Sequence, residues 1–115
     1  MQTPAQARHA LRVAGITVPL IHPLFTASGG CLDPCASGFM VVHTGGGCMA
    51  LRRDSDDFYM MITSEDGSDV PDIQELENSL IGVYRVLDGE EIACVTALAW
   101  KEVISLEADP SRIVA

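Results

Sequence analysis

The amino-acid sequence predicts an α+β fold in which an antiparallel sheet of about five strands carries helices on one face. Three short apolar or alternating segments follow one another between residues 39 and 63, separated by turn-forming residues. Two further β-rich segments flank Asp88-Gly89, and helical signals stand at the N-terminus and near residue 70. The predicted order is helix, loop, three strands, short helix and two or three strands. The 115 residues therefore fit a single domain, 1–115.

The first predicted element is a short amphipathic helix. Thr3 is a typical N-cap residue and Pro4 suits the first helical position. Gly15 fits the C-terminal stop of the helix. We expect Arg8 and Arg12 on the polar side of this helix.

The middle of the chain changes from loop to strands. Residues 16–38 hold three prolines and three glycines and predict extended segments and turns that wrap part of the core. Residues 39–43, 48–53 and 57–63 then predict a three-stranded antiparallel meander. The last of these strands has two largely apolar faces, which predicts a central strand covered on both sides.

The run Gly45–Gly47 lies in the first turn of the meander. Glycines allow the left-handed backbone angles of a hairpin loop. Three in a row exceed the need of a tight turn, so we also expect another chain segment to approach the backbone closely there.

Residues 70–79 predict one or two helical turns, with Asp69 as the cap and Pro71 in the first turn. Beyond them, Asp88-Gly89 predicts a hairpin with a type I′ turn, in which both central residues have positive φ. Residues 99–115 fit either a further strand or a helix, which Asp109-Pro110 ends.

The charge is distributed unevenly along the chain. The net charge is −9, yet residues 1–53 carry four arginines against Asp33 alone. The densest acidic stretch, Asp54 to Glu77, contains nine acids and no Lys or Arg. Direct nucleic-acid binding is therefore disfavoured, because phosphate contacts need clustered Lys and Arg. A basic surface on a partner protein is the natural counterpart.

Eight carboxylates of this stretch are the predicted partner-binding residues: Asp54, Asp56, Asp57, Glu65, Asp66, Asp69, Asp72 and Glu75. The alternative is a solvated acidic surface that keeps a small apolar domain soluble. The sequence contains no run of apolar residues long enough for a transmembrane helix and shows no signal-peptide pattern at its N-terminus. We therefore expect a cytoplasmic protein with no membrane association.

Four kinds of chemistry are possible on the residues alone. Cys31, Cys35, His43 and Cys48 could bind zinc, and Cys48 with His43 could form a nucleophile and base. The backbone of Gly45–Gly47 could cradle an anion, although no P-loop lysine follows. The acidic turns carry calcium-type ligands without the EF-hand pattern. We expect none of these sites: no catalytic residue, no metal and no cofactor, with the cysteines reduced.

The segments HTGGGCMA (43–50) and YMMITSEDG (59–67) resemble small uncharacterised proteins encoded by bacteriophages and prophages, which share an HTGGGC turn followed by ITxxDG. The resemblance covers roughly residues 39 to 90. It implies a context and no activity: small phage accessory proteins frequently bind and block host machinery, including CRISPR defence complexes.

The leading hypothesis is a small acidic phage-type accessory protein. It would act without catalysis by binding a basic host protein surface, as an inhibitor of a nucleic-acid-binding or CRISPR complex. One alternative is a Cys/His-centred enzyme or zinc-stabilised domain. The other is a phage structural or assembly component, whose mark would be formation of a homo-oligomer.

Overall fold

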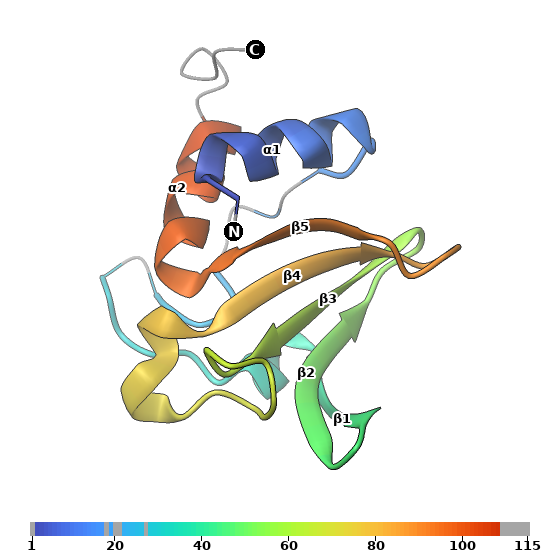
Figure 1. Cartoon of the computed structure of the whole chain (residues 1–115). Helices are drawn as coiled ribbons and strands as arrows, with labels where there is room; N and C mark the ends of the chain where they lie inside the picture. Colours follow the sequence, from blue (N-terminus) through green and yellow to red (C-terminus); the bar gives the residue numbers. More distant parts are fainter. Residues whose placement is uncertain (1, 18, 20–21, 27, 109–115) are drawn as a thin grey trace.

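The fold is a five-stranded antiparallel sheet with two α-helices packed on one face, as the computed structural model shows for residues 2–17, 19, 22–26 and 28–108 (Figure 1). The strands are β1 (Met40–Gly45), β2 (Cys48–Asp54), β3 (Phe58–Thr63), β4 (Leu80–Arg85) and β5 (Glu91–Thr96). Each strand pairs with its neighbour in the chain, so the sheet order is β1-β2-β3-β4-β5. The predicted α+β class, meander and second hairpin are confirmed.

The N-terminal helix α1 (Pro4–Val13) begins as the sequence predicts. The Thr3 hydroxyl accepts a hydrogen bond from the Gln6 N–H over 3.2 Å, and the Gln6 side chain accepts one from the Thr3 N–H over 2.9 Å. This reciprocal capping box satisfies two amide donors of the first turn. Gly15 follows the C-cap with φ of 78°. Arg8 does not lie on a polar face, however: it is buried and ion-paired with Glu107.

The segment after β5, which the sequence left open between strand and helix, is the second helix, α2 (Ala97–Ala108). It packs against α1, and both helices lie on the same face of the sheet near β4 and β5 (Figure 1). Trp100, Val103 and Leu106 recur at helical spacing and are buried. The expected stop at Asp109-Pro110 lies outside the described residues.

The core lies between the helices and one face of the sheet. Leu51, Ile62, Ile81 and Val95 stand opposite one another across four neighbouring strands and are all buried. The prediction that β3 is central is confirmed, but the expected cover on both of its faces is wrong. Alternation places Tyr59, Met61 and Thr63 on the other face, where they are half-buried.

The loop before the sheet closes one side of this core, as expected. Leu24, Phe25 and Phe39 are buried, and Phe25 forms an isolated antiparallel bridge with Cys31. One short 3₁₀ helix, η1 (Pro34–Ser37), interrupts the extended segments. Asp33 caps it by accepting a hydrogen bond from the Cys35 N–H over 3.0 Å.

The β1–β2 turn has the left-handed glycine angles that the sequence predicts, whereas the β4–β5 turn differs from its prediction. At Asp88-Gly89 only Gly89 has positive φ, so the expected type I′ geometry is wrong; the Gly89 N–H instead donates to the Arg85 carbonyl over 2.8 Å. The two-residue turn with positive φ at both central residues is Gly46-Gly47, where φ is 60° and 82°. Gly45 also has positive φ, at 104°, where the β1–β2 register shifts.

The short helical segment between β3 and β4 is the 3₁₀ helix η2 (Ile73–Asn78). Its cap is Asp72, which accepts a hydrogen bond from the Gln74 N–H over 3.0 Å. The predicted cap at Asp69 and the placement of Pro71 in the first turn are therefore wrong. Among the helices of the described ranges, none combines the length and apolar character needed to cross a bilayer.

Candidate functional site

The eight predicted partner-binding carboxylates lie in two groups at opposite ends of β3. The first group, here called the acidic turn group, is Asp54, Asp56 and Asp57 at the β2–β3 turn. The second, the acidic loop group, is Glu65, Asp66, Asp69, Asp72 and Glu75, between β3 and β4. A strand of this length spans roughly 20 Å. The dense acidic stretch of the sequence is thus divided in space by the strand that runs through it.

Arginine side chains lie at the same end of the sheet as the acidic turn group. Arg52 donates its Nε–H to Asp54 Oδ1 over 2.7 Å. Arg85, the last residue of β4 and opposite Phe58 at this end of the sheet, pairs with Asp88 and Glu90 of the β4–β5 turn. The hydrogen bond from Arg85 lowers the pKa of Asp88. The negative charge at this end is therefore partly compensated by two guanidinium groups.

Among the described residues, no Lys or Arg forms an ion pair with the acidic loop group. The sequence contains no Lys or Arg between Arg53 and Arg85. A shallow hollow of about 540 Å³ opens here, lined by Ser64, Glu65, Asp66, Ser68, Asp69 and Glu75. It is the more strongly negative of the two acidic surfaces.

Asp66 organises the loop that carries this hollow. Its Oδ1 accepts hydrogen bonds from the Ser64 hydroxyl over 2.6 Å, the Ser68 hydroxyl over 2.7 Å and the Ser68 N–H over 3.1 Å. Hydrogen bonds that favour the carboxylate lower its pKa to about 2, with the Ser64 bond the largest cause. Asp66 therefore stays negatively charged across the whole physiological pH range.

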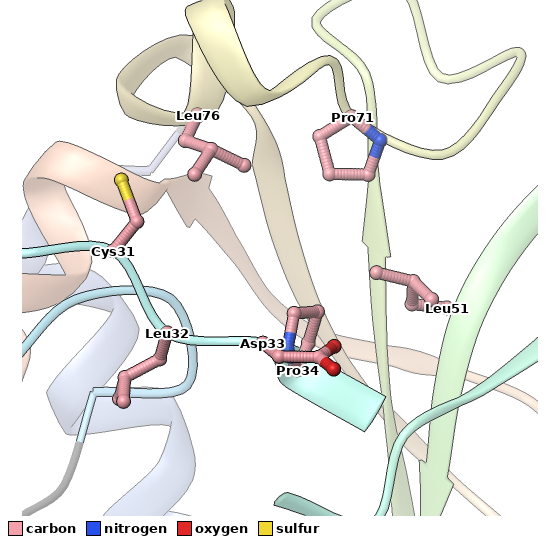
Figure 2. A pocket seen from close by; sticks show the side chains of 7 residues that line it. All are labelled: Cys31, Leu32, Asp33, Pro34, Leu51, Pro71 and Leu76. Carbon is pink, nitrogen blue, oxygen red and sulfur yellow. The ribbon is translucent and has the colours of Figure 1, made fainter. Parts of the chain in front are cut away.

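Figure 2 shows an apolar pocket, which has a volume of about 330 Å³. It is lined by Cys31, Leu32, Asp33, Pro34, Leu51, Pro71 and Leu76. Pro71 and Leu76 form one side, the loop of residues 31–34 forms the opposite side, and Leu51 of β2 lies at one end (Figure 2). The volume suits one or two aliphatic side chains or a small ligand.

The apolar pocket and the acidic hollow share one short segment of chain. Pro71 and Leu76 line the pocket, whereas Glu75 lines the hollow. Asp72 lies in the same segment and caps η2. An apolar recess and uncompensated carboxylates are thus presented side by side, the arrangement of a binding site with an apolar centre and a charged rim. No sequence pattern predicts the pocket, because its walls come from three distant parts of the chain.

The described residues do not form a set of ligands for zinc or for calcium. Within the described residues, no three His, Cys, Asp or Glu side chains are grouped so that they could hold a metal ion. All four cysteines are free of disulfide bonds; Cys31 and Cys35 are exposed in the loop around η1. The residues Cys31, Cys35, His43 and Cys48 therefore do not form the tetrahedral site that their spacing allowed.

Cys48 and His43 do not pair as a nucleophile and base. His43 lies directly opposite Met49 across the β1–β2 hairpin, so the two side chains share a face of the sheet. Cys48 precedes Met49 and projects from the other face. The two side chains therefore lie on opposite faces of the β1–β2 hairpin. A base that activates a thiol must lie within hydrogen-bond reach of it, and this arrangement does not provide that contact.

The glycine turn also departs from expectation. A Cβ placed at Gly45, Gly46 or Gly47 would meet no atom within 4 Å. The expected close approach of another segment is therefore wrong. All three residues are glycine because all three have positive φ, which is costly for any residue with a side chain. The turn is followed by strand β2, which begins at Cys48, and not by the helix that follows the glycines in a phosphate-binding loop.

The face of the sheet away from the helices carries two stacked aromatic side chains. The rings of Tyr59 and Tyr84 stack with centroids 5.2 Å apart, and the Arg52 guanidinium lies 3.9 Å from the centroid of Tyr59. A second, smaller hollow of about 220 Å³ lies on this face, bounded by Met61 and Cys94 among others. The side chains of β3 alternate between the two faces of the sheet. Because both alternating sets are largely apolar, the sequence does not show which set faces away from the helices.

No protein-family model matches the chain, and no curated protein and no solved structure shows significant similarity to it.

Proposed function

We propose that this protein is a non-enzymatic binding protein that engages a basic, extended segment of a partner protein. The acidic loop group takes the Lys or Arg side chains of that segment, and the apolar pocket takes one aliphatic side chain between them. The supporting observation is that Pro71 and Leu76 line the pocket while Glu75 lines the acidic hollow.

The two parts of this surface have different roles. Uncompensated carboxylates accelerate association with a positive partner and orient it. An aliphatic side chain buried in the pocket gives affinity, because the apolar centre of an interface carries most of its binding free energy. Asp66, with its pKa near 2, remains charged throughout. Asp54, Asp56 and Asp57 form a secondary acidic surface, with Arg52 already pairing with Asp54.

The biological setting is a further part of the proposal. A basic surface that normally holds nucleic acid is the natural target of such a protein. Its occupation would inhibit a host nucleic-acid-binding complex, including a CRISPR defence complex, in the cytoplasm of the host cell. The resemblance at residues 43–50 and 59–67 supports the phage context. The sequence places no clustered Lys and Arg where the chain could bind nucleic acid itself.

Fluorescence anisotropy with a labelled synthetic peptide tests the charged surface. The probe alternates Lys and Gly around a central Leu. Two variants remove three charges each: Glu65→Gln/Asp69→Asn/Glu75→Gln, and Asp54→Asn/Asp56→Asn/Asp57→Asn as the matched control. We expect the first to weaken binding about tenfold and to flatten its salt dependence, at roughly 0.5 kcal/mol per exposed charge. The control should weaken binding less. Equal effects, or unchanged binding of both variants at low salt, would contradict the proposal.

The same probe tests the apolar pocket. A second peptide has Asp in place of the central Leu. This change in the peptide should weaken binding to the wild-type protein more than binding to the protein variant Leu76→Gln, because that protein has already lost one apolar wall of the pocket. Leu76 is only partly buried, so the variant is expected to fold. If both proteins bind the two peptides with the same ratio of affinities, the pocket does not hold the aliphatic side chain.

A further inference from the structure

The two outer edges of the sheet are treated differently. The β5 edge is covered by α1, and the side chain of Gln2 bonds directly to its backbone. Gln2 Nε2 donates to the Ile92 carbonyl over 3.3 Å, and Gln2 Oε1 accepts from the Cys94 N–H over 2.9 Å. A neighbouring strand would offer the same donor and acceptor to these two residues. Gln2 therefore stands in for a strand and closes this edge.

The β1 edge carries no comparable cover within the described residues. β1 pairs with β2 alone, and five of its six residues are exposed. Met40 is 70% and Val41 is 50% exposed, which is unusual for apolar side chains on a strand. Met40–Gly45 contains no proline and no charged residue, the features by which proteins usually discourage pairing at an exposed edge. The outward N–H and C=O groups of this edge are thus available to another strand.

We propose that β1 is a homodimer interface, in which the β1 strands of two copies pair antiparallel across a two-fold axis to form a continuous ten-stranded sheet. With the axis at Val42, Val41 lies opposite His43 of the other copy and Met40 lies opposite Thr44. Both exposed apolar side chains are then covered, and each copy satisfies the outward backbone groups of the other.

The charge distribution favours a second copy in antiparallel orientation. A chain with net charge −9 repels itself over most of its surface, but the six residues of β1 carry no formal charge. Met40 pairs with Arg52, so the start of β1 lies near the Asp54–Asp57 turn. Parallel pairing would set two such acidic turns side by side. Antiparallel pairing sets each one beside the uncharged Gly45–Gly47 turn of the other copy.

Analytical ultracentrifugation of the full chain tests the interface, from about 1 µM to about 1 mM, the range of weak affinities. Val41→Lys places a charge on the proposed interface. Val86→Lys is the matched control, because Val86 has the same 50% exposure but lies in the β4–β5 turn. We expect the wild type and Val86→Lys to shift reversibly to a dimer and Val41→Lys to stay monomeric. Met40→Lys, at a still more exposed position, should repeat the loss.

Hydrogen exchange identifies the surface that is used. Amides of β1 should become protected as protein concentration rises, while those of β5 should not change, because Gln2 and α1 already cover that edge. A wild type that stays monomeric over the whole range overturns the proposal. So does equal association of the Val41→Lys and Val86→Lys variants, or a dimer in which β1 gains no protection.

Discussion

The imidazole of His22 joins the loop before the sheet to the start of α2: His22 Nε2 lies 2.8 Å from the carbonyl oxygen of Ala97. On the other side of the ring, the Leu24 N–H donates to His22 Nδ1 over 3.0 Å. Because Nδ1 accepts, the proton of the neutral ring is on Nε2 and is donated to Ala97. A second proton would have to be placed on Nδ1, against an N–H donor.

The stability of the protein should therefore fall in mild acid. Burial lowers the pKa of His22 below its ordinary 6.5, and the charge of Lys101 acts in the same direction, outweighing the hydrogen bond to Ala97. Between the lowered folded-state pKa and 6.5 the unfolded chain binds more protons, so the free energy of unfolding decreases as pH falls through this range. Urea denaturation at a series of pH values from 7.5 to 5 measures this change in the free energy of unfolding. His22→Gln should flatten this dependence, because it removes the buried imidazole.

A side chain at Gly82 would displace the ring of Tyr84. A Cβ there would lie 2.7 Å from both Cε1 and Oη of Tyr84. Gly82→Ala should cost about 1–3 kcal/mol of stability and turn the ring away from the sheet. Burial, followed by the charge of Glu91, raises the pKa of Tyr84 to about 12, and exposure should return it toward 10.

Ultraviolet titration of the tyrosines checks this displacement, and Tyr84→Ala provides the control background. If the ring is the only obstacle, adding Gly82→Ala to Tyr84→Ala should cost less than adding it to the wild type. An unchanged tyrosine titration in Gly82→Ala would show that the sheet itself moves instead.

The ion pair between Arg8 and Glu107 ties α1 to α2 at the cost of leaving polar atoms without partners. Arg8 Nε and Nη1 are buried and make no hydrogen bond to any part of the chain that the structure describes. Glu107→Ala would leave a buried guanidinium unpaired and should destabilise by about 3–5 kcal/mol. The double variant Arg8→Leu/Glu107→Leu should lie within about 1 kcal/mol of the wild type, or above it. Thermal unfolding compares them, with the exposed Arg12→Leu as a control; a double variant as unstable as the single one would refute this account.

The Gln2 side chain should matter more than its place at the chain end suggests. Gln2→Glu keeps the acceptor for Cys94 but loses the donor for Ile92 and sets a carboxylate against that carbonyl. We expect a loss of about 1–3 kcal/mol and faster exchange of the Cys94 amide. Gln74→Glu, an exposed substitution of the same kind, should change neither quantity. Equal behaviour of the two variants would mean that Gln2 does not hold the β5 edge.

The elements that the sequence predicted well depend on local chemistry. Thr3 and Pro4 define the start of α1 because capping involves only residues within the first turn. The five strands follow from short apolar runs between turn formers. The turn types were less predictable: Asp88-Gly89 fits a two-residue loop, but the hairpin there uses a longer one. Gly46-Gly47 was the better candidate, with no side chain at either position.

The candidate site depends on distances that no sequence window shows. Asp57 and Glu65 are close in the sequence, yet β3 lies between them and carries them to opposite ends of the sheet. Conversely, Leu51 and Leu76 are far apart in the sequence and line one pocket. The partners of His22 and Arg8 cannot be read from the sequence, because Ala97 and Glu107 come from the other end of the chain.

β5 passes into α2 without a connecting residue. Thr96 is the last residue of the strand, and its hydroxyl accepts a hydrogen bond from the Ala99 N–H over 3.1 Å in the first turn of the helix. One residue inserted at this junction would rotate the whole of α2 by about 100°. Trp100, Val103 and Leu106 would then leave the core together. Length variation in natural or engineered versions of this chain should therefore be confined to the glycine hairpin and the other surface turns, while the spacing from Glu91 to Leu106 stays constant.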